Sequence, residues 1–239
     1  MSGRTIAFSA VWWFVSAATA ATIAIDVGHY TAEPGAISAR GRPELEFNRD
    51  LAAEIATALQ ALGHSSRIIG ADGGMQDLWR RPRAAQGADF FISVHHDSTQ
   101  ARFQSIWMFE GSEQHYSDRF AGFSLFVSRD NRTWRSALQC ASAIGAALIK
   151  AEFRPSLYHA DPVVGENRPF ADKSNGVHYY DHLAVLRHAA MPAVLFEAGV
   201  IVNRDEELRL RDTAVQKQLA YGVAAGVNEC LAKMKRKKQ

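Results

Sequence analysis

Three apolar, β-prone runs of the sequence each end in a residue that could bind a metal or transfer a proton. His29 and His95 follow the first and second runs, and Glu197 stands near the end of the third, residues 192–199. Short apolar runs bounded by Gly, Pro or Asp indicate strands buried on both faces, as in a parallel sheet covered by helices. Because the carboxyl ends of such strands form the ligand-binding rim, we expect these side chains to share one site, and zinc suits them best.

A catalytic zinc takes three protein ligands and leaves a fourth position for water. The strand ends supply His29 and His95, so a third ligand is expected from a neighbouring helix or loop. Glu44 follows Pro43 at the predicted start of the first helix, at the same rim as the strand before it. Glu197 then remains as the general base that takes a proton from the zinc-bound water and returns it to the leaving amine.

The elements that must hold these residues alternate along the chain. Helices are predicted from apolar residues spaced at i, i+4 and i+8, and strands from short apolar runs. The predicted helices cover 44–62, with an apolar stripe from 47 to 62, then 134–151 and a final stretch from 212 or 213. Further strands are predicted at 64–70, 105–109 and 123–127. Strands that alternate with helices predict one α/β domain with a mostly parallel twisted sheet, covered by helices on both faces.

Composition sets limits on the partners. The 239 residues support one α/β domain with a substantial core, and the net charge of +2 gives no indication of nucleic-acid binding. The basic residues cluster at 233–238, where a solvated helix end is expected rather than a patch for an anionic polymer or membrane surface. Cys140 and Cys230 fall in predicted helices, and the sequence leaves open whether they pair or remain two buried thiols.

The N-terminus predicts export. A basic start leads into a short apolar run at 5–15, followed by small residues at 16–21. This pattern is typical of a secretory signal peptide, so we expect residues 1–20 to be removed and residues 21–239 to form a periplasmic or secreted domain. The apolar run is too short to cross a bilayer comfortably, so no stable membrane span is expected.

Four separated segments also resemble, in order, the motifs of a known enzyme family. They read Asp-Val-Gly-His at 26–29 followed by Pro-Gly-Ala at 34–36, Glu-Leu-Glu-Phe-Asn at 44–48, Phe-Ile-Ser-Val-His at 91–95, and Pro-Ala-Val-Leu-Phe-Glu-Ala-Gly at 192–199. These segments are similar to the motifs of the zinc-dependent N-acetylmuramoyl-L-alanine amidases of the AmiC/CwlV type. The resemblance covers residues 22 to about 230.

The resemblance implies His29, Glu44 and His95 as zinc ligands and Glu197 as the catalytic acid and base. It also implies that the substrate is peptidoglycan and that the amide between N-acetylmuramic acid and the L-alanine of the stem peptide is hydrolysed. The sequence shows no separate wall-binding domain. Recognition is therefore expected to rest on the catalytic domain or on a partner such as a protein activator.

Two of these assignments have competitors next to them. Strand alternation points His95 and His96 in opposite directions, and the family motif favours His95 as the ligand. Glu44 and Glu46 both fall in the first helical turn, where acidic residues also favour the helix dipole, and the motif favours Glu44. The other histidines, including His159, are expected to be surface or loop residues.

Two other functions fit the same residues. One is a catalytically silent peptidoglycan-binding or regulatory protein on the same fold, and the other is a zinc peptidase or deacetylase that acts on another amide. Departures from the family pattern, such as Tyr30 in place of a glycine, bear on the shape of the substrate groove. Residues 98–121 are longer than the family's usual connection, and they could form a flap over the zinc or a regulatory element.

Overall fold

The computed structural model describes residues 20–236, so the expected signal peptide lies outside the described residues except for its last position. The helices are α1 (Glu44–Ala61), α2 (Arg80–Ala84), α3 (Trp134–Lys150), α4 (Ala184–Arg187), α5 (Arg204–Arg211) and α6 (Thr213–Arg236). The strands are β1 (Thr22–Val27), β2 (Ser65–Ile69), β3 (Phe90–Asp97), β4 (Ser105–Phe109), β5 (Ser112–Tyr116), β6 (Ser124–Val127), β7 (Phe170–Asp172), β8 (Val177–Tyr179) and β9 (Ala193–Val200).

The central sheet has seven strands in the order β2-β1-β3-β9-β6-β8-β7. Four of its pairings are parallel, while β6 runs antiparallel to β9 and β7 antiparallel to β8. The mostly parallel sheet predicted from the sequence is therefore confirmed. The parallel core β1-β3-β9 places three carboxyl strand ends at one edge of the sheet, where a ligand site is expected.

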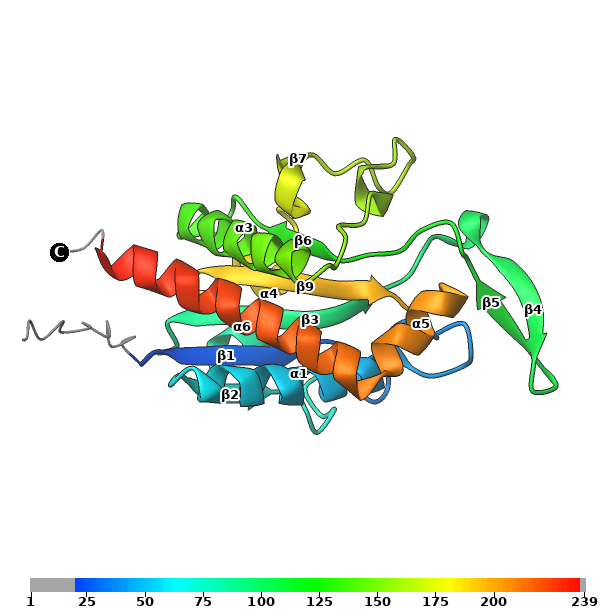
Figure 1. Ribbon diagram of the computed structural model, residues 1–239, viewed down its shortest axis with the longest axis horizontal. Helices are drawn as coiled ribbons and strands as arrows, with labels where there is room; N and C mark the ends of the chain where they lie inside the picture. Colours follow the sequence, from blue (N-terminus) through cyan, green and yellow to red (C-terminus); the bar gives the residue numbers. More distant parts are fainter. Residues whose placement is uncertain (1–19, 237–239) are drawn as a thin grey trace, which may run out of the picture.

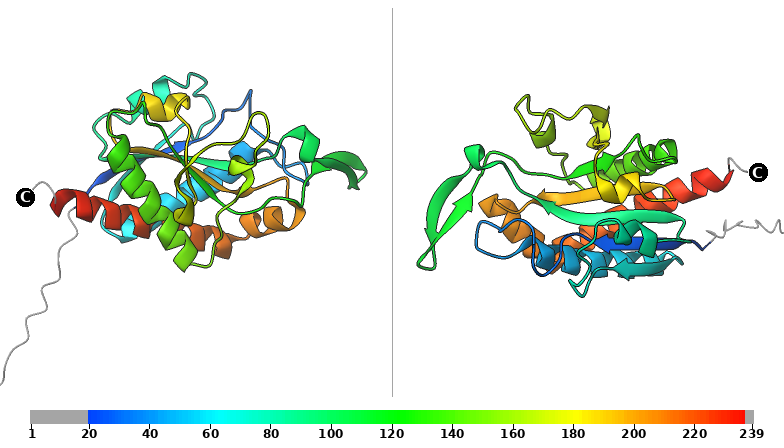
Figure 2. Two further views of the ribbon diagram at one scale, coloured as in Figure 1. Left: turned by 90° about the horizontal axis from the view of Figure 1, so that it is seen from above. Right: turned by 180° about the vertical axis from the view of Figure 1, so that it is seen from behind.

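Helices cover both faces of the sheet, as Figure 2 shows in the view from above. On one face the strands pack against α1, α3 and α6, and on the other against the short helices α2 and α4. Strand β3 shows how the sequence divides between the faces, because Phe90 and Ile92 join the first core and Phe91 joins the second. A strand that is buried on both faces reads as a continuous apolar run, which is the pattern that predicted it.

Residues 98–121 form neither a flap nor a long loop. They contain a short 3-10 turn (Ala101–Phe103) and the antiparallel pair β4-β5, which forms its own two-stranded sheet. Figure 1 shows this hairpin projecting beyond the end of the main sheet, past α5. The sequence predicted β4 but not β5, because Ser112–Tyr116 is polar and only partly shielded.

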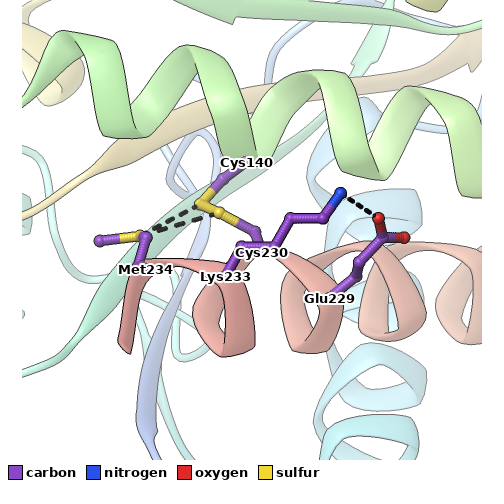
Figure 3. The surroundings of a disulfide bond; sticks show 5 residues. All are labelled: Cys140, Glu229, Cys230, Lys233 and Met234. Carbon is purple, nitrogen blue, oxygen red and sulfur yellow. Dashed lines mark hydrogen bonds and ion pairs between the residues drawn. A yellow bond between two sulfur atoms is a disulfide. The ribbon is translucent and has the colours of Figure 1, made fainter. Parts of the chain in front are cut away.

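A disulfide joins the two long helices on the first face. Cys140 of α3 and Cys230 of α6 are both fully buried, and their Cα atoms lie 5.0 Å apart. Figure 3 shows the bond between the helices, with the Met234 sulfur 3.8 Å from that of Cys230. The helices can approach this closely near the bond because Gly226 of α6 lacks a side chain; a Cβ there would lie 2.4 Å from the Cα of Ile144. The pairing left open by the sequence is thus resolved in favour of a disulfide.

Within residues 20–236, none of the helices is both long enough and apolar enough to cross a bilayer.

The disulfide should contribute strongly to stability. The bond closes a loop with a sequence separation of 90 residues, for which restriction of the unfolded chain predicts about 4 kcal/mol. We expect the double variant Cys140→Ala/Cys230→Ala to lose about that much free energy of unfolding in urea, and the reduced wild type to lose a similar amount. Met234→Leu, which keeps the volume beside the sulfurs, is the control. Equal stability of the double variant and the wild type would contradict the prediction.

Candidate metal centre

The three residues at the strand ends meet at one edge of the sheet. His29 follows β1, His95 lies near the end of β3, and Glu197 lies in β9, and these strands are neighbours in the order β1-β3-β9. His95 and Glu197 stand directly opposite each other in the parallel pairing of β3 with β9. The strands therefore bring together side chains that are far apart in the sequence.

Glu44, the first residue of α1, lies between the two histidines. Its Oε2 is 2.9 Å from Nε2 of His29, and its Oε1 is 3.0 Å from Nδ1 of His95. One ligand atom from each of the three residues lies within 4.8 Å of the others. Glu46, the competitor in the same first turn of α1, instead pairs with Arg42 at the surface. Two imidazole nitrogens and a carboxylate oxygen are a donor set that suits zinc.

Several donors fix the Glu44 carboxylate. The side-chain amide of Asn48 donates to Oε1 at 3.1 Å, the backbone N–H of His96 donates to Oε1 at 3.2 Å, and that of Ala36 donates to Oε2 at 3.1 Å. Burial would raise the pKa of Glu44, but hydrogen bonds from His29 and His95 outweigh it and hold the pKa well below its usual range. The group is therefore an ionised, oriented carboxylate with only 4% of its surface exposed.

His96 points away from this centre, as strand alternation predicts. It lies on the opposite face of β3, where its Nδ1 is 2.8 Å from Oδ1 of Asn48. Complete burial lowers the pKa of His96 to about 3, so the ring is neutral and its Nδ1–H donates to Asn48. His96 thus orients Asn48, which in turn donates to Glu44.

Two glycines make room for the imidazole rings. A Cβ on Gly28 would lie 2.3 Å from the ring of His95, and a Cβ on Gly35 would lie 2.4 Å from Oε2 of Glu44. Gly35 also has φ +83°, a left-handed conformation that other residues adopt at a cost. Both glycines belong to the sequence motifs around His29. The two glycines therefore leave the space that the donor side chains occupy. Both this space and the types of donor atom fit a metal ion.

Glu197 is a partly buried residue with one buried, unpartnered carboxyl oxygen. Its Oε2 makes no hydrogen bond within residues 20–236. Burial raises the pKa of Glu197 well above its usual range, and the nearby charges of Asp97 and Glu44 add to this effect. A cation held by the neighbouring donors would favour the ionised form, so this group is suited to take up and release a proton.

A cavity of about 360 Å³ opens beside these residues. Its wall includes His29 and His95 together with Tyr30, Leu78 and other side chains from the loops after β1 and β2 and from α4. None of residues 98–121 lines the cavity, so the expectation of a flap over the metal is wrong. The site is closed on one side by α2 and α4 instead.

The family model described as N-acetylmuramoyl-L-alanine amidase matches residues 23–229, which is most of the chain. The chain belongs to the N-acetylmuramoyl-L-alanine amidase family. The amidase AmiC of Neisseria meningitidis serogroup B is 26% identical, over 86% of this chain and 51% of the relative. The probable amidase AmiB of Haemophilus influenzae is 25% identical with the same coverage, so the chain spans about half the length of these curated relatives.

Solved amidase structures share the fold. The amidase Ami1 of Mycobacterium smegmatis superposes with a TM-score of 0.70 at 19% identity, covering 89% of this chain and 97% of that one. The amidase of Clostridium difficile 630 gives a TM-score of 0.68 at 21% identity with the same coverage. The single α/β amidase domain expected from the sequence is therefore confirmed as a fold.

Arg81 stabilises the end of β1 next to the metal centre. The sequence shows only a basic segment at this position, and no role was predicted for it. Its buried guanidinium pairs with Asp26 at 2.8 Å and donates to the carbonyls of Val27, His29 and Met75. The Asp26 carboxylate also accepts a hydrogen bond from Ser93 at 2.7 Å. His29 has φ +68°, which is uncommon for a residue with a side chain. Arg81 therefore holds the end of β1 in the turn that directs His29 at Glu44.

A second group that sequence reasoning missed lies at the end of β3. His159 was expected to be a surface or loop residue; it lies in a short 3-10 turn, but it is buried, with Nε2 2.7 Å from Asp97 and Nδ1 2.9 Å from Glu166. His64, in the loop before β2, is buried too, and the prediction is wrong for His178, which is buried within β8. The contact spans 62 residues of sequence, and for that reason no local pattern revealed it.

Loss of Arg81 should destabilise the protein severely. Replacement by Met leaves the Asp26 charge buried without its partner, for which about 3–5 kcal/mol of unfolding free energy is expected. The neighbouring Arg80 is exposed and makes no side-chain contact among the described residues, so Arg80→Met is a matched control. Urea denaturation of both variants measures the difference, and an equal loss in the two would refute the assignment.

His159 should make stability depend on pH. Burial lowers the pKa of His159, but its ion pairs with Asp97 and Glu166 outweigh burial and raise it to about 9. Because the folded pKa exceeds the unfolded value near 6.5, the contribution is complete below pH 6.5 and disappears as the pH rises through 9.

The size of that contribution follows from the shift. Relative to His159→Gln, the wild type should be more stable by about 3 kcal/mol at pH 6, with the gap shrinking toward pH 10. Urea denaturation at several pH values measures this gap. A gap that stays constant with pH would show that the histidine is not charged in the folded state.

Proposed function

We propose that this protein is a zinc-dependent N-acetylmuramoyl-L-alanine amidase. It would hydrolyse the amide between N-acetylmuramic acid and the L-alanine of the peptidoglycan stem peptide. One observation carries the proposal: His29, Glu44 and His95 converge beside the unpartnered carboxyl group of Glu197, in a chain of the amidase family.

The metal is proposed from the donor set. His29, Glu44 and His95 would hold zinc through two nitrogens and one oxygen, the composition of many catalytic zinc sites. Zinc in such a site lowers the pKa of its bound water to about 7 and polarises the amide carbonyl.

The chain's own residues complete the chemistry. The Glu197 carboxylate takes the proton of the attacking water and then gives it to the leaving nitrogen of L-alanine. Glu44 is unsuited to this task because five groups already donate to or flank its two oxygens. Arg81 and Asn48 keep His29 and Glu44 in place, so little reorganisation is needed when substrate binds.

The site of action is proposed to be the periplasm or the exterior of the cell. The disulfide between Cys140 and Cys230 supports this, because such bonds persist in oxidising compartments. The leader-like pattern at residues 1–20 supports it independently, as does a polymeric substrate that lies outside the cytoplasm.

A protein activator belongs to the same proposal. The CwlD amidase of Clostridioides difficile, which shares this fold with a TM-score of 0.64, was solved in complex with the GerS lipoprotein. An amidase of this fold can therefore form a complex with a second protein, which supports the proposal of an activator for this chain.

Two rival functions make different predictions. A silent peptidoglycan-binding protein would have no use for a buried, unpartnered Glu197 carboxyl oxygen beside three converging donors. A zinc peptidase or deacetylase would use the same residues on another amide, and only its products would differ. Cleavage at the proposed bond yields intact stem peptides with a free L-alanine amine, whereas a deacetylase would yield acetate.

Glu197→Gln should abolish turnover while zinc is retained. The amide keeps the size of the side chain but cannot accept the proton, so release of stem peptides from purified peptidoglycan should fall by about 10²–10⁴-fold. Zinc content, measured by atomic emission, should stay at that of the wild type, whereas a chelator should stop the wild-type reaction. His115→Ala, on the exposed face of β5, is the control. Peptide release that survives both Glu197→Gln and chelation would refute the proposal.

A further inference from the structure

A half-exposed tryptophan lies at the rim of the metal-site cavity. Trp79 is 50% exposed, and the preceding residue, Leu78, is 49% exposed and lines the cavity. The tryptophan of the β4-β5 hairpin differs, since Trp107 donates to the carbonyl of Ala39 and lies under the guanidinium of Arg40. Exposed apolar surface that continues a pocket is a common mark of a ligand groove.

The indole ring of Trp79 stacks on His188. The ring centroids are 3.7 Å apart with an interplanar angle of 31°. Trp79 immediately precedes α2, and His188 immediately follows α4, whose Ala184 and Val185 line the cavity. In Figure 2, seen from above, the short yellow helix α4 lies beside the cyan segment that contains α2, on the side of the sheet away from α3. The two rings therefore lie at the ends of the two helices that contribute residues to the cavity wall.

We propose that Trp79 and His188 form a platform on which a sugar ring of the peptidoglycan glycan strand stacks beside the catalytic cavity. This inference rests on the proposed amidase function. The platform is a substrate subsite outside the metal centre, and it takes a neutral pyranose ring as its ligand.

The cavity is small beside a polymeric substrate, which favours a further subsite next to it. A cavity of about 360 Å³ accommodates a segment of the size of a small drug molecule. Peptidoglycan is a polymer, so the sugars next to the scissile bond must lie on the surface that adjoins the cavity. Leu78 connects the two, because it lines the cavity while its neighbour Trp79 faces solvent at the rim.

The chemistry of the pair suits a sugar better than a stem peptide. One face of a pyranose presents C–H bonds, which pack against the electron-rich face of an aromatic ring, while its hydroxyl groups remain at the edge. Desolvation and the charges of Arg187 and Arg83 lower the pKa of His188, which favours the uncharged form of its ring. A stem peptide offers no comparable apolar face to this surface; its carboxylates would instead meet Arg83 and Arg187 at the edge, so a peptide subsite is the alternative that the experiments below decide.

The basic side chains around the platform can donate hydrogen bonds to the polar groups at the edge of the sugar ring. Arg83 is exposed and its side chain makes no hydrogen bond or ion pair within residues 20–236, so its N–H groups are available to hydroxyl and acetamido oxygens. Arg187 is held only loosely, with Nε 3.8 Å from Asp130 at the surface. A stacking surface with free donors at its edge is the arrangement that a carbohydrate subsite requires.

The first experiment measures glycan binding without turnover. The probe is a soluble oligosaccharide of alternating N-acetylglucosamine and N-acetylmuramic acid from which the stem peptides have been removed, titrated into the zinc-loaded protein by calorimetry. We expect Trp79→Ala to weaken binding about tenfold and His188→Ala to weaken it less, whereas Trp79→Phe should stay close to the wild type. Tyr221→Ala, an exposed aromatic on α6, is the matched control and should bind normally.

The second experiment separates binding from chemistry. On polymeric peptidoglycan, Trp79→Ala should raise KM about tenfold with little change in kcat and with full zinc content, because the substitution leaves the metal centre intact. Circular dichroism verifies that the variant is folded, and Trp79→Phe provides the rescue that a purely structural role of the indole would not allow.

Each outcome decides a different point. Oligosaccharide binding that is equal in Trp79→Ala and the wild type would overturn the platform. Competition by free stem peptide at this surface, with no effect of the sugar, would overturn it in favour of a peptide subsite. If Trp79→Ala loses the sugar while the wild type releases no stem peptides, the platform stands and the proposed amidase activity fails.

Discussion

The guanidinium of Arg81 is the contact on which the metal centre depends. Strand β1 must end abruptly if His29 is to turn toward Glu44, and that turn leaves the carbonyls of Val27 and His29 without partners in the sheet. Arg81 satisfies both carbonyls and neutralises Asp26, which itself accepts a hydrogen bond from Ser93 of β3. Burying this charge is costly, and ion pairs of this kind persist where they fix geometry rather than where they add stability.

Electrostatics then explain why the centre suits a cation. Glu44, Glu197 and Asp97 lie close enough together for their charges to interact, and the pKa of Glu197 rises partly for this reason. The two imidazoles that face Glu44 carry charge only when protonated. A divalent ion would relieve the repulsion between the carboxylates and would replace the contacts between Glu44 and the two histidines. Burial, together with this negative charge, raises the pKa of Glu197, and a nearby cation would lower it again, so cation binding and the readiness of Glu197 to act as a base are linked.

The sequence predicts the site residues that lie on strands or directly after them. His29, His95 and Glu197 follow from apolar runs and their ends, and the structure places all three at one edge. Glu44 needed the family motif, because its distinction from Glu46 depends on which way the first turn of α1 faces. Arg81 and His159 could not be predicted, since their partners on β1 and β3 lie 52 to 62 residues away and their own surroundings read as polar loops. Helix α5 was not predicted either, because its eight residues are mostly charged and show no apolar stripe. Its buried residues are Glu207 and Leu210, and the Asn203 side chain caps its first turn.

Two tryptophans, Trp107 in the hairpin and Trp79 beside the cavity, lie in opposite environments. On the side of β4 and β5, Trp107 is fixed by a hydrogen bond to Ala39, and Arg204 lies 5.2 Å from its ring centroid, so the ring anchors the hairpin to the body. On the side of α2 and α4, the indole ring of Trp79 packs against His188, and half of the surface of Trp79 remains open. An anchored hairpin needs its aromatic surface covered, whereas a surface that binds a polymer must leave it free. The cavity wall continues toward Trp79 and includes none of the hairpin, so the substrate path leads from the metal centre across α2 and α4.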